Sequence, residues 1–215
     1  MRAWLGLAVL AALALDAWTK GAGNISEMLW ACHWASALIA MGLLADSRTA
    51  AAAGLLFHLA LGIPAWLLGI LFTGEVYPTS VLVHSAPAVA ALVYLRGIRT
   101  WPRHAWSWAW IIHPAAIAVS ERFARPELNV NMAHQPWPPL AHLFASLHLF
   151  HLSAISLSLI MLLLMNRAME RWVAERAQPR RVRASREPHT FPAQSGPRPQ
   201  GCGKIEEPNS VARAR

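Results

Sequence analysis

The run TAAAAGLLFHLALGIPAWLLGILF, residues 49–72, contains no charged residue. An uncharged apolar stretch of about 18 residues or more is long enough to cross the hydrocarbon core of a bilayer as a helix. Pro64 lies inside this run, so we expect the helix to be kinked there. Five further apolar segments cover residues 3–18, 25–45, 76–95, 104–120 and 140–165. The sequence therefore predicts an all-α fold, a polytopic bundle of about six transmembrane helices over residues 1–177.

The composition agrees with a membrane protein. Hydrophobic residues make up 55% of the 215 residues and charged residues only 14%, whereas soluble proteins carry about 25% charged residues. The 11 tryptophans suit membrane–water interfaces. The net charge of +8 lies in short loops and a C-terminal tail. This distribution argues against a nucleic-acid partner and favours attraction to anionic membrane lipids.

Lysine and arginine orient the helices, because short cytoplasmic loops carry an excess of them. With the N-terminus inside, 16 of these residues lie inside and only Lys20, Arg122 and Arg125 lie outside. This predicts a multi-pass protein of the bacterial inner membrane with both termini cytoplasmic. A cleaved signal peptide is the alternative for the first segment, since Ala12-Leu13-Ala14 resembles a cleavage site. We favour a retained helix, in which Asp16 and Lys20 form an i,i+4 pair at the outer end.

The last 38 residues, 178–215, are rich in Pro, Arg, Ser and Gly. Such a segment cannot bury enough apolar surface to fold, so we expect a disordered cytoplasmic tail. It holds Cys202, far in the predicted topology from Cys32, so no disulfide is expected. The chain has no Cys/His spacing typical of a zinc site.

Three residues in the apolar segments are candidates for catalysis: Glu27, Cys32 and His84. Glu27 follows Asn24 by three residues, which is typical of a capping box at a helix start; alternatively, its carboxylate orients His84. Cys32 is either inert packing or a nucleophile activated by a histidine of another helix. His84 shares a helix face with Ser80, whose hydroxyl would fix its tautomer; a purely structural histidine is the alternative.

The polar stretch PELNVNMAH, residues 126–134, separates the last two apolar segments. Leu, Val and Met alternate with polar residues, which favours an extended segment with its amides on one face. We therefore expect Asn129, Asn131 and His134 to bind a ligand, because binding residues are often carried on loops held by a scaffold. A plain surface loop of turn-forming residues is the alternative.

The other histidines allow a second interpretation, a haem-binding cytochrome. His58 with His113, and His84 with His148 or His151, fall at matched depths on different helices, as paired axial ligands would. Interhelical hydrogen bonding is the structural alternative for the polar residues of the last helix. The sequence predicts no other metal ligands and leaves the cofactor open. A transporter is disfavoured, because broken helices do not recur in two halves; a non-enzymatic subunit of a membrane complex stays open.

Three motifs carry a resemblance to known families: EMLWAC at 27–32, TSVLVH at 79–84, and PELNVNMAH at 126–134. Together they resemble an uncharacterised family of small bacterial six-helix membrane proteins over roughly residues 22–165. The layout is also faintly similar to the YwaF-type membrane proteins, some of whose relatives transfer acyl groups on membrane lipids through a Cys and a His. The resemblance implies these roles for Cys32 and His84. In that family the His precedes the Cys, whereas His33 follows Cys32 here.

The leading prediction is an outward-facing polar pocket that performs acyl transfer or hydrolysis on a membrane lipid. Cys32 or a water would attack an ester, with His84 as the base. Asn129 or Asn131 would stabilise the oxyanion.

Overall fold

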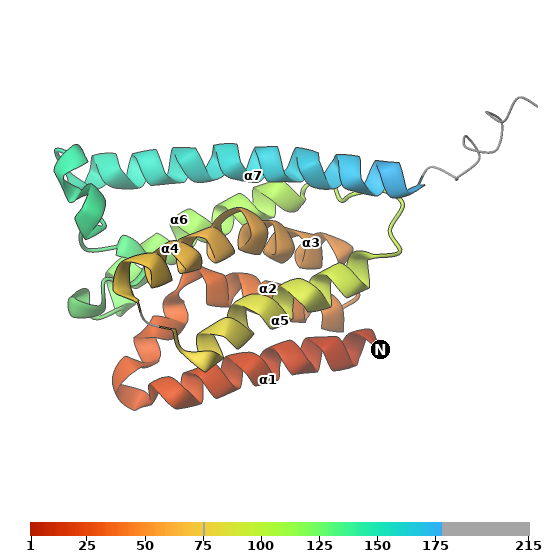
Figure 1. The fold of residues 1–215 in the computed structure, drawn as a ribbon, viewed down its shortest axis with the longest axis horizontal. Helices are drawn as coiled ribbons and strands as arrows, with labels where there is room; N and C mark the ends of the chain where they lie inside the picture. The colour runs from red at the N-terminus through yellow and green to blue at the C-terminus, as the bar shows by residue number, and fades with distance from the viewer. Residues whose placement is uncertain (75, 178–215) are drawn as a thin grey trace, which may run out of the picture. The chain divides into compact units, whose positions relative to one another are not determined.

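The computed structural model describes residues 1–74 and 76–177, and within them the chain is all-helical with no strand. The long helices lie side by side along one direction, with α1 and α7 on opposite sides of the bundle (Figure 1). The elements are α1 (Arg2–Lys20), η1 (Ala22–Leu29), α2 (Ala31–Leu44), α3 (Arg48–Phe57), η2 (His58–Gly62), α4 (Ile63–Thr73), α5 (Pro78–Leu95), α6 (Ala105–Phe123), η3 (Pro126–Leu128), η4 (Val130–Met132), η5 (Pro138–Leu143) and α7 (Leu147–Ala177).

Several helices are long and apolar enough to cross a membrane. In the described part of the chain these are α1, the continuous segment Arg48–Thr73, α5 and α7, with the bent pair η1 and α2 as a fifth candidate. Leu71, Leu152 and Leu164 are among the many large apolar side chains left exposed on the bundle. Lipid tails are as apolar as leucine, so such a surface is compatible with a transmembrane protein.

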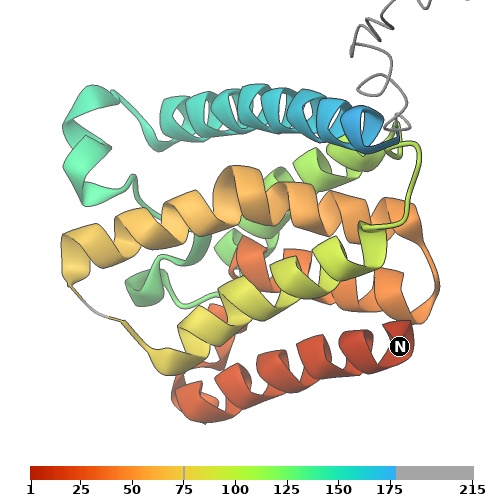
Figure 2. The ribbon, with the colours of Figure 1, turned by 45° about the vertical axis from the view of Figure 1, so that its right-hand side comes forward.

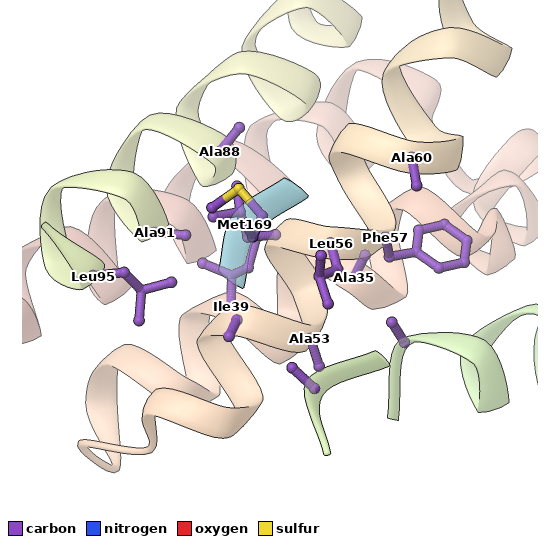
Figure 3. Packing of buried hydrophobic residues seen from close by; sticks show 14 of the residues in the cluster. Ala35, Ile39, Ala53, Leu56, Phe57, Ala60, Ala88, Ala91, Leu95 and Met169 are labelled. Atoms are coloured by element: carbon purple, nitrogen blue, oxygen red, sulfur yellow. The ribbon is translucent and has the colours of Figure 1, made fainter. Parts of the chain in front are cut away.

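The centre of the bundle is α2, which packs against α1, α3, α5 and α6. Its buried face is made largely of small residues, and these let neighbouring backbones approach closely. A methyl group added at Gly54 of α3 would lie only 2.6 Å from the carbonyl oxygen of Ala35. Figure 3 shows part of the buried cluster to which Ala35 and Ile39 of α2 belong, together with side chains of α3, α5 and α7.

The second predicted segment, 25–45, is not one straight helix. The chain bends by 74° between η1 and α2, with Trp30 in a non-helical conformation at the bend. The capping-box prediction is wrong, because α2 begins at Ala31 and neither residue of the motif caps it. Asn24 accepts a hydrogen bond from Arg125, and Glu27 pairs with Lys20.

The expected distortion near Pro64 takes the form of a π-helical turn, η2, between α3 and α4 (Figure 2). Proline has no N–H, so the carbonyl group four residues earlier loses its helical partner, and the preceding turn widens. This turn begins at His58 and ends at Gly62, in the middle of the bundle.

The polar stretch 126–134 is not extended, contrary to the prediction. It forms two short 3-10 turns, η3 and η4, with Asn129, Asn131 and Met132 at positive φ. Asparagine tolerates this left-handed conformation better than most residues, so the alternation of polar residues reflects successive turns rather than a strand. The last helix also begins later than predicted, at Leu147, after the proline-led turn η5. The predicted disordered tail lies outside the described residues.

Candidate active site at Cys32

Cys32 lies in the first turn of α2, next to the bend at Trp30, and is partly buried. Its Sγ is 3.7 Å from Nδ1 of the adjacent His33. The backbone N–H groups of a first helical turn have no intrahelical acceptor, and their dipoles favour negative charge nearby. The thiol therefore lies where a thiolate would be stabilised.

Asp16 of α1 completes an Asp–His–Cys arrangement. Nε2 of His33 is 2.9 Å from Oδ2 of Asp16, and only 3% of Asp16 is exposed. A carboxylate accepts hydrogen bonds, so Nε2 carries the proton and Nδ1 presents its lone pair to the thiol. Lys20 Nζ lies 3.7 Å from the same carboxylate, as the predicted i,i+4 partner.

A second imidazole, His84 of α5, lies in the neighbourhood of the same thiol. Its Nδ1 is 2.8 Å from the carbonyl oxygen of Ser80. A carbonyl only accepts, so Nδ1 carries the proton and Nε2 can take a proton from sulfur. The sequence assigned this orienting role to the Ser80 hydroxyl, but the backbone carbonyl makes the contact. The ring also stacks on Trp66, with 4.9 Å between ring centroids, which fixes its plane.

Glu27 is not part of this group. Its Oε2 bonds Lys20 Nζ at 2.6 Å, which ties η1 to the end of α1. The partner of Glu27 in the structure is thus Lys20, and not the predicted His84. The buried carboxylate is Asp16, and it acts on His33.

His58 contacts the candidate site indirectly, through Ser36. Its Nε2 is 2.9 Å from Ser36 Oγ, and Ser36 donates to the carbonyl oxygen of Cys32. The hydroxyl hydrogen is directed at that carbonyl oxygen, so Nε2 of His58 donates to the serine oxygen. A Cβ added at Gly62 would lie 3.2 Å from Nδ1 of His58 and 3.7 Å from the Cβ of Cys32. The absence of a side chain there leaves room beside both residues.

The histidines are not arranged as the predicted haem ligands. The rings of His58 and His84, which belong to different predicted ligand pairs, are 6.1 Å apart and nearly perpendicular, and each ring already bonds an oxygen of a serine residue. His113 lies close to His151 rather than pairing with His58, and His148 is exposed. Within residues 1–74 and 76–177, no group of three or more His, Cys, Asp or Glu side chains is placed to hold a metal ion.

Asn131 holds the start of α2 instead of facing a ligand. Its Oδ1 accepts from the N–H of Ala31 at 2.9 Å. Its Nδ2 donates to the carbonyl of Leu29 and to Ser120 Oγ, both at 2.8 Å. The amide thus bridges both sides of the bend that precedes Cys32, and its hydrogen-bonding capacity is used by the protein. The predicted ligand-binding and oxyanion roles of Asn131 are contradicted by these contacts.

The side chain of Asn129 is likewise used within the loop. Asn129 Oδ1 accepts from the N–H groups of His134 and Gln135, and its Nδ2 donates to the carbonyl of Gln135. These bonds close the turn around the positive φ of Asn129. Nε2 of His134 is buried and has no hydrogen-bond partner among the residues that the structure describes. The side-chain amide of Asn129 thus serves loop closure, whereas the ligand role of His134 stays a prediction.

Sequence reasoning missed Asp16 and His33. Asp16 is the only acidic residue in the first apolar segment, and a charge at that depth is a functional candidate by default. It was explained by Lys20, a partner visible in the sequence, whereas His33 becomes a partner only when α1 and α2 pack together.

Comparison with protein-family models, with curated proteins and with solved structures finds no match to this chain. The assignment of chemistry therefore depends on the geometry around Cys32.

Proposed function

We propose that this chain is an integral membrane enzyme that uses Cys32 for acyl transfer or hydrolysis on membrane lipids. The observation that carries the proposal is the environment of one sulfur atom. Sγ lies 3.7 Å from Nδ1 of His33, with His84 in the neighbourhood, and each imidazole has a tautomer fixed by a partner on one nitrogen. A nucleophile, a base and a group that orients the base are the parts that covalent acyl chemistry needs.

The reaction follows from these contacts. An imidazole nitrogen accepts the thiol proton, and the thiolate attacks the carbonyl carbon of an ester. The N–H of Cys32, in the first turn of α2, is suited to stabilise the oxyanion. Collapse of the intermediate breaks the ester C–O bond, and the imidazolium returns its proton to the departing alcohol. The resulting thioester on Cys32 is then attacked by a hydroxyl group or by water, which releases the acyl group.

The roles of the two histidines differ in the proposal. His33 with Asp16 resembles the His–Asp pair that stabilises an imidazolium during catalysis. His84 has only a carbonyl behind it, and a carbonyl stabilises a positive ring less than a carboxylate does. We therefore assign His33 as the base for the thiol and His84 as the second proton carrier, available to the incoming acceptor.

The proposed membrane arrangement has six spans with both termini cytoplasmic, in a bacterial inner membrane. The sixth span is α6, which adds 19 helical residues to the five candidates. Two polar contacts at the ends of the bundle support this arrangement. Arg2 forms an ion pair with Asp46 at one end, and Arg125 donates a hydrogen bond to Asn24 near the other. Reporter fusions after residues 21, 46, 75 and 124 test this topology, and a cytoplasmic signal at residue 21 would overturn it.

The catalytic proposal is tested by intact-mass analysis of the purified full-length chain after incubation with phosphatidylethanolamine and phosphatidylglycerol vesicles. We expect an acyl adduct that hydroxylamine removes, and we expect Cys32→Ser to abolish it. Cys202→Ser is the matched control, since Cys202 is the only other cysteine, and it should retain the adduct. No adduct, or an adduct that survives in Cys32→Ser, would overturn the proposal. It would also be overturned by unchanged membrane lipid composition in a His84→Ala strain.

A further inference from the structure

An apolar groove of about 370 Å³ lies beside the candidate site, between α1 and the η1–α2 segment. Its volume falls within the range of small-molecule sites, roughly 300–1,000 Å³. The groove is lined by Leu13, Met28, His33, Trp34, Ala37 and Met41.

The lining selects the kind of molecule that the groove can hold. Five of its six side chains offer no charge, and His33 is the single ionisable group. Met28 and Met41 have flexible thioethers, which adapt to chains of variable shape. A polar or charged ligand would lose its hydration there and find few polar partners in return. An unbranched hydrocarbon chain has no hydrogen bonds to water that it would lose on entering the groove.

The position of His33 connects the groove to the chemistry. The same ring forms part of the groove wall and lies 3.7 Å from Sγ of Cys32. A chain in the groove would therefore bring its head to the imidazole that we assign as the base. The groove is also open, and Met41 on its edge is 55% exposed, so a chain can enter sideways from the lipid phase.

From these observations we infer that the groove between α1 and α2 binds the acyl chain of the substrate and presents its ester carbonyl to Cys32. The inference rests on the proposed function and adds the substrate class: esters of long, unbranched fatty acids. The chemical group that carries the acyl chain lies beyond the groove and contributes little to this recognition.

The test fills the groove at its smallest lining residue. Ala37→Phe places a ring in the groove, and Leu13→Trp does so from the opposite helix. Ala11→Phe is the matched control, since Ala11 is exposed on α1 and does not line the groove. Thermal unfolding of each purified variant identifies any that fail to fold.

The first readout is the rate of Cys32 acylation by nitrophenyl palmitate and nitrophenyl butyrate in the same detergent micelles. We expect Ala37→Phe to lower the palmitate-to-butyrate ratio by roughly tenfold, the usual scale for steric exclusion from an apolar pocket. Ala11→Phe should leave the ratio unchanged. An unchanged ratio in both groove variants would overturn the inference.

The second readout does not require catalysis. Palmitic acid carrying a diazirine is photolysed with the full-length protein in phosphatidylcholine nanodiscs, and the labelled peptides are mapped. We expect labelling to concentrate on residues 28–41 and to fall in Ala37→Phe alone of the two phenylalanine variants. Labelling spread evenly over lipid-facing side chains would overturn the inference that the groove binds the acyl chain, even if Cys32 is acylated. If neither ester acylates Cys32 but the label maps to the groove, the proposed function fails and the chain-binding site stands.

Discussion

Asn131→Ala should destabilise the protein and displace Cys32, because one amide holds both sides of the bend before α2. The substitution removes the acceptor of the Ala31 N–H and the donor to the Leu29 carbonyl and to Ser120. Leaving a buried polar group unsatisfied costs about 1–3 kcal/mol. Alanine at the positive φ of residue 131 adds about 1 kcal/mol, since a Cβ disfavours the left-handed region.

The total, about 2–4 kcal/mol, corresponds to a fall in Tm of roughly 4–16 °C for a domain of this size. The assay is thermal unfolding of the purified chain in one fixed detergent. Asn131→Gly separates the two causes, because glycine accepts the positive φ but makes no side-chain hydrogen bond. We expect it to be less destabilised than Asn131→Ala by about 1 kcal/mol.

The position of Cys32 is measured in the same samples by the rate at which iodoacetamide alkylates it. A shifted α2 start should change this rate in both Asn131 variants, whereas Ser120→Ala, which keeps the bonds to Ala31 and Leu29, should change it less. A Tm within 1–2 °C of wild type for Asn131→Ala would refute the claim that this amide secures the bend.

Gly54→Ala should lower the free energy of unfolding by about 1–3 kcal/mol, because its Cβ would lie 2.6 Å from the Ala35 carbonyl oxygen; thermal unfolding checks this, and a neutral result would contradict the close approach. Asp46 accepts a hydrogen bond from Tyr94 and pairs with Arg2, and both hold its pKa below the ordinary value. Its contribution to stability should therefore be complete above about pH 4, the unfolded carboxyl pKa, and be lost as the pH falls through the lowered value; a pH series of Tm for Asp46→Asn should show a shallower acid limb than wild type. Asp16→Asn should slow Cys32 acylation by roughly 10²–10⁴-fold, the range for loss of acid–base assistance, with single-turnover acylation as the measurement and an unchanged rate as the contrary outcome.

The all-helical fold class could be predicted from the sequence, because the hydropathy and the length of a segment do not depend on its contacts with other segments. The uncharged run 49–72 lies within one continuous helical segment, Arg48–Thr73. The breaks were harder to predict. The bend at Trp30 depends on Asn131, about a hundred residues away, and nothing within residues 25–45 encodes that contact.

The candidate site was predictable only in part, because contacts between distant segments are not visible in the sequence. Cys32 and His84 stood out as reactive side chains in apolar segments, and the structure brings them together. The orienting groups were assigned to Glu27 and the Ser80 hydroxyl, which are close in sequence or share a helix face with them. The actual groups, Asp16 and the Ser80 carbonyl, depend on helix packing and backbone geometry, which a residue pattern does not report.

The short length of α2 has a consequence for the membrane around the protein. Its 14 residues rise about 21 Å, less than the hydrocarbon thickness of about 30 Å. In the proposed topology Cys32 is therefore sunk below the outer boundary of the hydrocarbon layer, at the level of acyl chains rather than of headgroups. A lipid ester must descend to meet it, or the bilayer must thin locally. The thickness of the surrounding bilayer should therefore affect how often a lipid ester contacts Sγ of Cys32.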